Sequence, residues 1–404
     1  MASSTFLHRV KLRNYRSIGA CDVQLGRLCF LVGPNGSGKS NFVDALRLVG
    51  DGLNRSLDHA LRDRGGIGEV RRRSSGHPTH FAIRLEFENA EMKGHYAFEV
   101  GAAANGAWTV KREECHVLPT ADLLKYPEGV EFSVVSGAVQ RFSATLGVAP
   151  PASADRLFLV NAAGHQPFRM VFDALSHMGF YNLNPDVMRQ LQPPDPAHLL
   201  HRDGGNLASC LARLAGDPTR KQRLLEYLGR VVPGVVDVEP VAFGNLETVE
   251  FRQQVQGAKD SWRFRAQNMS DGTLRALGVL LALLQKGNGH PVALIAVEEP
   301  EAALHPAAAG ILLDALREAS ASTQVIATSH SAELLDNKDL PEDSLLAVVA
   351  EANETRIGPI DAVGRESLRE RLYTAGELLR MSQLTPDPER SRPRQLELFG
   401  RGDA

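Results

Sequence analysis

Two adjacent carboxylates, Glu298 and Glu299, stand at the end of the apolar run LIAV, which is typical of a buried strand. Like charges beside a buried strand end are costly unless a positive group accompanies them. Two acids at the carboxyl end of a strand can divide the work, because one can hold a metal ion while the next orients or deprotonates water. We expect Glu298 to bind the metal and Glu299 to act on the water. In the alternative interpretation, both acids serve the N-terminus of a helix that starts at EEP.

A glycine-rich segment near the N-terminus could bind phosphates. GPNGSGKS matches the P-loop pattern GxxxxGK[ST], with strand-like sequence before it and helix-like sequence after it. The glycines let backbone N–H groups turn toward phosphates, Lys39 would reach the β- and γ-phosphates, and Ser40 would ligate Mg²⁺. We predict that ATP and Mg²⁺ bind at Gly33, Asn35, Gly36, Ser37, Gly38, Lys39, Ser40 and Asn41. The alternative is a glycine-rich turn that carries a lysine by chance.

Two further segments suit phosphate chemistry. Ser270 and Gly272 stand just before an apolar helix, and a helix N-terminus can bind an anion. His330 ends the strand-like run VIATSH, one strand–helix–strand step after the paired acids, which favours an imidazole that faces phosphate. The alternatives are a plain helix cap and a structural histidine.

Together these motifs resemble those of the ATP-binding-cassette (ABC) ATPases. NYRSI before the P-loop, GPNGSGKSN, SDGTLR and EEPEAALHP resemble the RecF-like and overcoming-lysogenisation-defect (OLD) branch, which is related to the heads of structural-maintenance-of-chromosomes (SMC) proteins. The matches cover residues 5–48 and about 262–336, while residues 50–250 match only loosely. The four motifs together are specific, although each alone is weaker.

The resemblance implies an α/β fold. We expect a P-loop NTPase of ABC type with a mixed sheet, an antiparallel β subdomain and a helical lobe. Alternating sequence predicts strands within residues 79–117, and two helices separated by GDP are predicted within 207–234. The expected domains are a split ATPase head at 1–90 and 240–350, an inserted β/helical lobe at 91–239, a C-terminal extension at 351–382 and a disordered tail at 383–404.

The resemblance also implies residue roles and a homodimer. Lys39 and Ser40 become the phosphate and metal residues, Glu299 the general base and His330 the γ-phosphate switch histidine. A signature would contact ATP bound to the opposite subunit, and it consists of Ser270, Asp271 and Gly272. The loop Ala303–Pro306 would lie across the dimer. The implied assembly is a head-to-tail homodimer that ATP closes and hydrolysis opens.

The sequence departs from the wider family in two places. The usual first acid is Asp, and Glu298 is one methylene longer, which can change the Mg²⁺ geometry, although the OLD-like branch also uses EEPE. No Q-loop glutamine is clear, and Gln166 is the candidate for this further ATP-binding residue. OLD nucleases need a DxD in a Toprim domain, and none follows His330. We therefore expect no nuclease in this chain, and a separate nuclease or effector protein as a possible partner.

The composition favours a cytoplasmic protein. The four scattered cysteines form no CxxC pair, which argues against a zinc site or a disulfide framework. The N-terminus lacks a signal-peptide core, and the apolar run LRALGVLLALL is too short to cross a bilayer. We expect no membrane partner.

A DNA-binding surface would have to be local, because the net charge is -3. Five arginines around GGIGE favour phosphate contacts, and they are Arg62, Arg64, Arg71, Arg72 and Arg73. DNA is therefore a plausible partner. The alternative is a solvated loop.

The last residues contain a short peptide with apolar anchors. QLELF comprises Gln395, Leu396, Glu397, Leu398 and Phe399 and resembles the bacterial sliding-clamp-binding peptide. Leu and Phe anchors on a flexible tail suit a groove on a ring-shaped partner. The alternatives are a chance pentapeptide and a tail that packs on its own domain.

The expected function is that of an ATP-hydrolysing, ATP-dimerised and DNA-associated ATPase in DNA repair, genome maintenance or anti-phage defence. The alternative is a slow-turnover scaffold that ATP gates and that controls a partner effector. A nucleotide-binding subunit of a transporter would fit the cassette motifs, but NYRS and SDGTLR point elsewhere.

Overall fold

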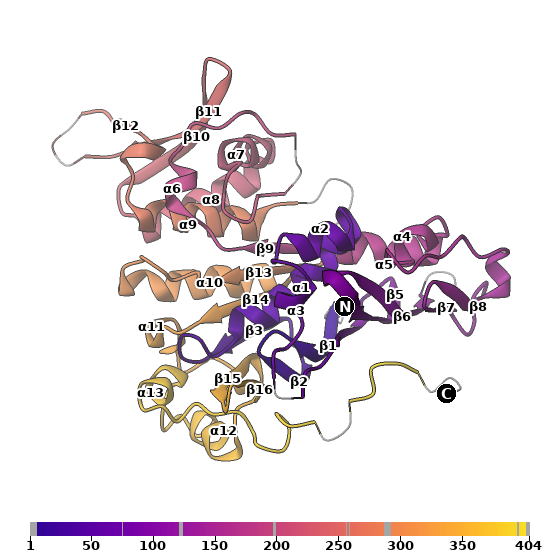
Figure 1. Cartoon of the computed structure of the whole chain (residues 1–404). Coiled ribbons are helices and arrows are strands. Elements are labelled where there is room, and N and C mark those ends of the chain that lie inside the picture. The colour runs from indigo at the N-terminus through magenta and orange to yellow at the C-terminus, as the bar shows by residue number, and fades with distance from the viewer. Residues whose placement is uncertain are drawn as a thin grey trace. The chain divides into compact units, whose positions relative to one another are not determined.

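The computed structural model describes residues 6–74, 76–120, 124–196, 199–255, 257, 259–286, 292–393 and 396–400. The chain forms two compact units (Figure 1). The first unit comprises Met1–Met178, Pro341–Leu372 and Met381–Ala404, and the second comprises Gly179–Leu340 and Tyr373–Arg380.

The first unit is built on a seven-stranded antiparallel sheet with the order β2-β1-β4-β5-β6-β7-β8. Alternating apolar residues place one face of the central strands in the core. Its strands are β1 (Leu7–Tyr15), β2 (Ile18–Gln24), β4 (His80–Glu88), β5 (Met92–Ala102), β6 (Trp108–Pro119), β7 (Val130–Val135) and β8 (Ala138–Phe142).

Three further strands of the first unit carry the P-loop. β15 (Leu345–Glu351) runs parallel to β3 (Leu28–Val32) and antiparallel to β16 (Glu354–Pro359). The near-continuous apolar sequence of β3 suits a strand that is covered on both faces. The helices of this unit are α1 (Lys39–Asn54), α2 (Leu57–Arg62), α3 (Ile67–Val70), α4 (Leu159–Ala162), α5 (Gln166–Ser176) and α12 (Ala362–Arg369).

Aromatic side chains join the sheet of the first unit to its helices. Phe132 of β7 meets Phe158 and Phe168 edge to face, with ring centroids 4.9 and 5.1 Å apart. All three rings are fully buried. Glu113 of β6 accepts hydrogen bonds from the backbone N–H groups of Phe158 and Leu159, which fixes the start of α4 against the sheet.

The second unit contains two groups of strands and the helices between them. β9 (Gly179–Tyr181), β13 (Leu294–Glu298) and β14 (Gln324–Ser329) are parallel, and β10 (Val235–Phe243), β11 (Leu246–Gln253) and β12 (Trp262–Arg265) are antiparallel. In Figure 1, α7 and α8 lie beside β10 and β11. The helices are α6 (Pro185–Met188), α7 (Leu207–Ala215), α8 (Pro218–Val231), α9 (Asp271–Leu284), α10 (Ala309–Ser320), α11 (Ala332–Leu335) and α13 (Ala375–Arg380).

The predicted fold class is confirmed. Parallel and antiparallel strands, an antiparallel β subdomain and a cluster of helices are all present. The predicted domain split differs from the two units, because β5 pairs with β4 and β6 along its length and carries the sheet across residue 91. In the described parts of the chain, no helix has both the length and the hydropathy needed to cross a membrane.

The tail also differs from the expected disorder at 383–404. Ile360 forms a β-bridge with Pro386, and Ser391 is buried. Farther along, Leu398 is only 2% exposed. The described tail residues therefore pack on the first unit, although the composition of the segment is polar and proline-rich.

Candidate functional site

The P-loop joins β3 to α1 in the first unit. Gly36 and Gly38 have left-handed backbone angles, with φ of 76° and 105°, which favour glycine. A Cβ atom on Gly36 would meet no atom within 4 Å, so the loop is open at this point. A Cβ atom on Gly38 would lie 2.0 Å from Oγ1 of Thr355, so the loop is closely supported there. One side of the loop is thus free for a ligand while the other is packed.

Two polar side chains of the P-loop, those of Lys39 and Ser37, are buried. Lys39 is 6% exposed, and its Nζ donates to the carbonyl oxygens of Gly33 and Pro34, at 2.8 and 3.0 Å. The hydroxyl of Ser37 is buried and has no hydrogen-bond partner among the described residues. A buried hydroxyl without a partner is costly, and a phosphate oxygen would satisfy it. These residues therefore fit the triphosphate of ATP.

A relay of hydroxyl groups holds the P-loop backbone from behind. Oγ1 of Thr355 donates to the carbonyl oxygen of Ser37 at 2.8 Å. Ser17 lies 2.7 Å from the same Oγ1, and Asn41 donates to Ser17 at 2.6 Å. Because the Thr355 proton is committed to Ser37, Ser17 donates to Thr355. The relay links β16, the β1–β2 turn and the first turn of α1.

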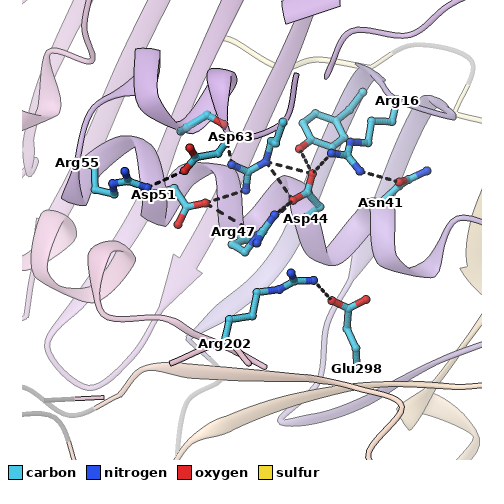
Figure 2. A network of polar contacts seen from close by, with 12 residues as sticks. Arg16, Asn41, Asp44, Arg47, Asp51, Arg55, Asp63, Arg202 and Glu298 are labelled. Carbon is cyan, nitrogen blue, oxygen red and sulfur yellow. Dashed lines mark hydrogen bonds and ion pairs between the residues drawn. The ribbon is translucent and has the colours of Figure 1, made fainter. Parts of the chain in front are cut away.

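The NYRS segment anchors α1 through a buried carboxylate. Asp44 of α1 accepts from the hydroxyl of Tyr15 at 2.7 Å and pairs with Arg16 at 3.1 Å (Figure 2). It also pairs with Arg47 at 2.6 Å and with Arg64 at 3.0 Å. Burial favours the neutral form of Asp44, but the three guanidinium groups outweigh this and lower its pKa. The segment that carries part of the family resemblance is thus a structural support for the P-loop helix.

Each of the arginines predicted to contact DNA has a partner within the protein. Arg64 is buried and binds Asp44 and Asp51, while Arg72 pairs with Glu354 at 2.8 Å. The others have partners as well: Arg62 pairs with Asp58, Arg73 with Glu69, and Arg71 donates to the carbonyl oxygen of Pro78. Arg62 and Arg73 remain 75% and 69% exposed in weak surface pairs, and Arg71 keeps its charge because its partner is a neutral carbonyl. Contact of this cluster with DNA therefore stays a prediction.

Gln166 is the exposed first residue of α5, which packs on α1. Its Q-loop role stays a prediction. In the second unit, the short strand β9 pairs with β13. The register aligns Tyr181 with Val297, so Asn182 follows at the level of Glu298.

Glu298 has a positive partner in the second unit. Its Oε1 accepts from the guanidinium of Arg202 at 2.9 Å, and Figure 2 shows the two side chains pointing at each other. The backbone N–H of Asn182 donates to the carbonyl oxygen of Arg202 at 2.8 Å, which fixes that residue beside β9. Glu298 is 11% exposed and Arg202 44% exposed. The paired charges explain how an acid is tolerated at this strand end.

Glu299 stands at a strained position next to His330. Its φ of 46° is rare outside glycine and costs free energy, which is common at functional sites. Its N–H donates to the backbone oxygen of Thr328 at 3.0 Å, because β13 and β14 end side by side. Its carboxylate lies 3.1 Å from Nδ1 of His330, and both side chains are 40% exposed. The predicted base and the predicted histidine therefore meet in an accessible position.

The loop after the paired acids is held by a third acid. Glu301 is buried, and it accepts a hydrogen bond from the hydroxyl of Ser329. Burial raises the pKa of Glu301 above its ordinary value, and the Ser329 hydrogen bond only partly offsets this. Glu301 thus ties the loop to the end of β14.

The predicted signature segment lies at the N-terminus of α9. Ser270 caps this helix by accepting from the N–H of Thr273 at 3.2 Å. Arg189 pairs with Asp271. A Cβ atom on Gly272 would lie 2.4 Å from the carbonyl oxygen of Ala303, so the predicted signature and the loop Ala303–Pro306 are close neighbours.

Reasoning from sequence missed two residues of these regions, Thr355 and Arg202. Thr355 stands in an ordinary strand pattern, and Arg202 in a loop among other polar residues. The sequence indicated only that Glu298, an acid at the end of a buried strand, needs a positive partner, and it did not identify Arg202 as that partner. Of the clamp-like peptide, Gln395 lies outside the described residues, and Leu396, Leu398 and Phe399 are described.

A family model matches more than half of the chain. It is described as "AAA domain, putative AbiEii toxin, Type IV TA system", and it matches residues 28–116 and 191–336. The first match contains the P-loop, and the second contains the predicted signature, the paired acids and His330.

Curated relatives match a short segment. The DNA replication and repair protein RecF of Vibrio parahaemolyticus is 44% identical over 59 residues, which are 14% of this chain and 16% of that protein. RecF of Vibrio cholerae is 42% identical over 59 residues, with the same coverage. The chain thus spans 16% of the length of these relatives.

Solved structures share the fold over most of the chain. The Smc head bound to the C-winged helix domain of ScpA has a TM-score of 0.51 and 14% identity, and the match covers 87% of this chain and 96% of that one. The Smc head with an extended coiled coil, derived from Pyrococcus furiosus and bound to the C-terminal domain of ScpA, also has a TM-score of 0.51, with 13% identity and coverage of 91% and 99%. The chain therefore belongs to the AAA domain family described as putative AbiEii toxin, Type IV TA system, and has the ABC-class fold of the RecF- and SMC-related ATPases.

Proposed function

We propose that this protein is an ATPase that binds Mg²⁺-ATP at its P-loop and hydrolyses it with Glu299 as the general base. The observation that carries the proposal is the Glu299–His330 pair, held at 3.1 Å on the ends of two neighbouring parallel strands. A base on a strained, exposed backbone position suits chemistry better than stability. The family match and the fold support the same activity.

Each residue then has a task. Lys39 and the P-loop N–H groups bind phosphate oxygens, and the unpartnered hydroxyl of Ser37 donates to one of them. Ser40 and Glu298 would hold Mg²⁺, which supplies charge neutralisation to the phosphates when bound. Glu299 accepts the proton of the attacking water, and His330 orients the Glu299 carboxylate through their contact.

The wider setting is also a proposal. The signature Ser270, Asp271 and Gly272 would complete the ATP site of a second copy, so that ATP closes a homodimer and hydrolysis opens it. The RecF relatives are named for DNA replication and repair, which supports a DNA-associated role. The family description names a putative toxin, which supports the anti-phage defence variant. A separate nuclease or effector protein would then carry out any cleavage.

A slow-turnover, ATP-gated scaffold is the second candidate. The Arg202–Glu298 pair favours it, because a cation on the predicted metal ligand opposes Mg²⁺ binding. Negligible turnover of ATP-locked dimers, with or without DNA, would select this alternative.

The test compares ATP binding and phosphate release in three forms of the full chain. Glu299→Gln should retain ATP affinity and lose about 10²–10⁴-fold in turnover, because only the base is removed. Glu298→Ala should weaken Mg²⁺-dependent ATP binding instead. Normal turnover of Glu299→Gln would show that the base is assigned to the wrong residue.

A further inference from the structure

The end of the chain lies on the seven-stranded sheet of the first unit. Cationic side chains from three strands donate to backbone carbonyl oxygens of the tail at 3.0–3.2 Å. The contacts are Lys11 to Glu397, Arg84 to Leu398 and Arg112 to Gly400. In return, the N–H of Gly400 donates to Oε1 of Glu114 at 2.9 Å. The tail backbone is therefore held at both ends of a four-residue stretch.

Two side chains of the tail, Leu398 and Phe399, also contact the protein, in addition to the backbone hydrogen bonds. Leu398 is 2% exposed, so it is as buried as a core residue. Phe399 lies under the guanidinium of Arg112, with 4.5 Å between Cζ and the ring centroid. A polar tail without binding energy of its own would not bury an apolar side chain in this way.

The receiving surface is a row of residues across four neighbouring strands. The register aligns Lys11 of β1 with Arg84 of β4, Arg84 with Ala97 of β5, and Ala97 with Glu114 of β6. Ala97 is the small member of the row, between long charged neighbours. The row thus offers cationic donors and one carboxylate on a rigid sheet.

Lys11 and Arg84 of this row form ion pairs and still have N–H groups that donate to the tail. Glu86 pairs with Lys11 at 3.2 Å and with Arg84 at 2.9 Å. Arg84 also pairs with Glu114 at 3.1 Å. The carboxylates orient the cations, and the tail carbonyls accept the N–H groups that remain. Hydrogen bonds from charged donors are stronger than neutral ones.

We propose that this row of Lys11, Arg84, Ala97 and Glu114, together with Arg112 of β6, is a peptide-binding surface whose resident ligand is the chain's own segment 396–400. The surface binds the peptide main chain and the Leu398 and Phe399 side chains. The docked tail is therefore withheld from any partner groove that needs the same two side chains. The sliding-clamp peptide predicted from sequence uses those residues, so docking on the sheet and binding to such a ring-shaped partner exclude each other.

Tethering explains how a short segment can stay docked and still be released. A tail attached to its site has an effective concentration on the order of mM, so weak contacts suffice to hold it. A partner that binds the free tail tightly can then compete, because each state uses Leu398 and Phe399. The sheet surface becomes exposed when the tail leaves.

The experiment uses a fluorescent synthetic peptide of residues 392–404 and full-length chains. In the Leu398→Ala/Phe399→Ala chain the resident tail no longer holds its place, so fluorescence anisotropy should report peptide binding. The wild-type chain, whose own tail competes, should bind the peptide at least tenfold more weakly. A peptide with the same two alanines should not bind.

Two further variants locate the site on the sheet. Adding Arg112→Ala to the Leu398→Ala/Phe399→Ala chain should weaken peptide binding severalfold. Adding Arg141→Ala, which removes an exposed arginine of β8 paired with Glu131, should leave binding unchanged. Equal binding to the wild-type and tail-variant chains would overturn the proposal, as would binding to neither or indifference to Arg112→Ala.

Discussion

Two regions of the molecule are held in different ways. The first is the P-loop region, residues 33–41, and the second is the acidic region, which comprises residues 298–306, 270–272 and 330. The P-loop is fixed by short-range contacts of buried groups, namely a hydroxyl relay through Thr355 and a carboxylate hub at Asp44. In the acidic region, the functional side chains stand in ion pairs that water reaches. Arg202 pairs with Glu298, and His330 pairs with Glu299.

This difference indicates that the P-loop is rigid before a ligand binds, whereas the carboxylates of the acidic region can change partners. Backbone that binds phosphate must be rigid, because its N–H groups are useful only in a fixed orientation. Carboxylates that serve a metal ion and a water molecule must be free to exchange partners, and exposed ion pairs are weak enough for this. Substitutions in the P-loop support should therefore cost stability and affinity, whereas removal of the cation that pairs with Glu298 should have a small effect.

Breaking the carboxylate hub should have the largest effect on stability. Asp44→Asn leaves the buried guanidinium of Arg64 with only the partly exposed Asp51 as an anionic partner. We expect the free energy of unfolding to fall by about 3–5 kcal/mol, as is usual when one partner of a buried ion pair is removed. Urea denaturation at pH 7 measures it. Asp63→Asn, which breaks the exposed pair with Arg55, is the control and should cost less than about 1 kcal/mol.

The stabilisation by Asp44 should depend on pH in a defined direction. The lowered pKa of Asp44 means that the unfolded chain binds its proton more readily than the folded chain does. The stabilisation is therefore complete above the ordinary aspartate pKa of about 4 and is lost as pH falls through the lower folded value. The stability gap between wild type and Asp44→Asn should be constant from pH 5 to 8 and should narrow below about pH 4. A gap that widens in acid would contradict the assignment of the hub.

Removing the hydroxyl relay should have an intermediate effect on ATP affinity. Thr355→Val keeps the shape but removes the donor to Ser37 and the acceptor for Ser17. The buried carbonyl of Ser37 and the half-buried hydroxyl of Ser17 lose their partner, which costs about 1–3 kcal/mol, and we expect ATP to bind about tenfold more weakly. Isothermal titration with ATP and Mg²⁺ measures the affinity.

The matched control for this change is Thr109→Val. Its hydroxyl is buried and has no hydrogen-bond partner among the described residues, so the same chemical change removes no interaction. Thr109→Val should bind ATP like the wild type and be at least as stable. An equal loss of affinity in both variants would mean that the relay has no specific part in shaping the P-loop.

The sequence motifs predicted candidate reacting groups but not the residues that support them. The P-loop pattern and the EE pair depend on local order along the chain, so Lys39, Glu298 and Glu299 could be proposed as site residues without a structure. Thr355 reaches Ser37 across 318 positions, and one threonine in a strand has no signature. The physical role of NYRS was also hidden, because Tyr15 and Arg16 act on Asp44 only once β1 and α1 are packed.

Charge patterns were the least reliable guide. Two of the arginines around GGIGE, Arg64 and Arg72, pair with carboxylates that lie elsewhere in the sequence, such as Glu354, and the charge pattern alone could not show this. The tail showed the same limit, because a polar, proline-rich composition did not reveal that Leu398 is buried. In contrast, the alternating strands of residues 79–117 were predicted correctly as β4, β5 and β6, because period-2 patterns report burial directly.

Releasing Glu298 from its ion pair should have the smallest effect and the opposite sign. Arg202 is 44% exposed, so its pair with Glu298 contributes no more than about 1 kcal/mol, which corresponds to roughly a fivefold change. In Arg202→Ala the carboxylate no longer has to exchange a guanidinium for a metal ion. We expect half-maximal binding of a fluorescent ATP analogue at up to about fivefold lower Mg²⁺ concentration. Arg202→Lys keeps the charge and should resemble the wild type, whereas a higher Mg²⁺ requirement in Arg202→Ala would make Arg202 a ligand of the nucleotide rather than a competitor of the metal.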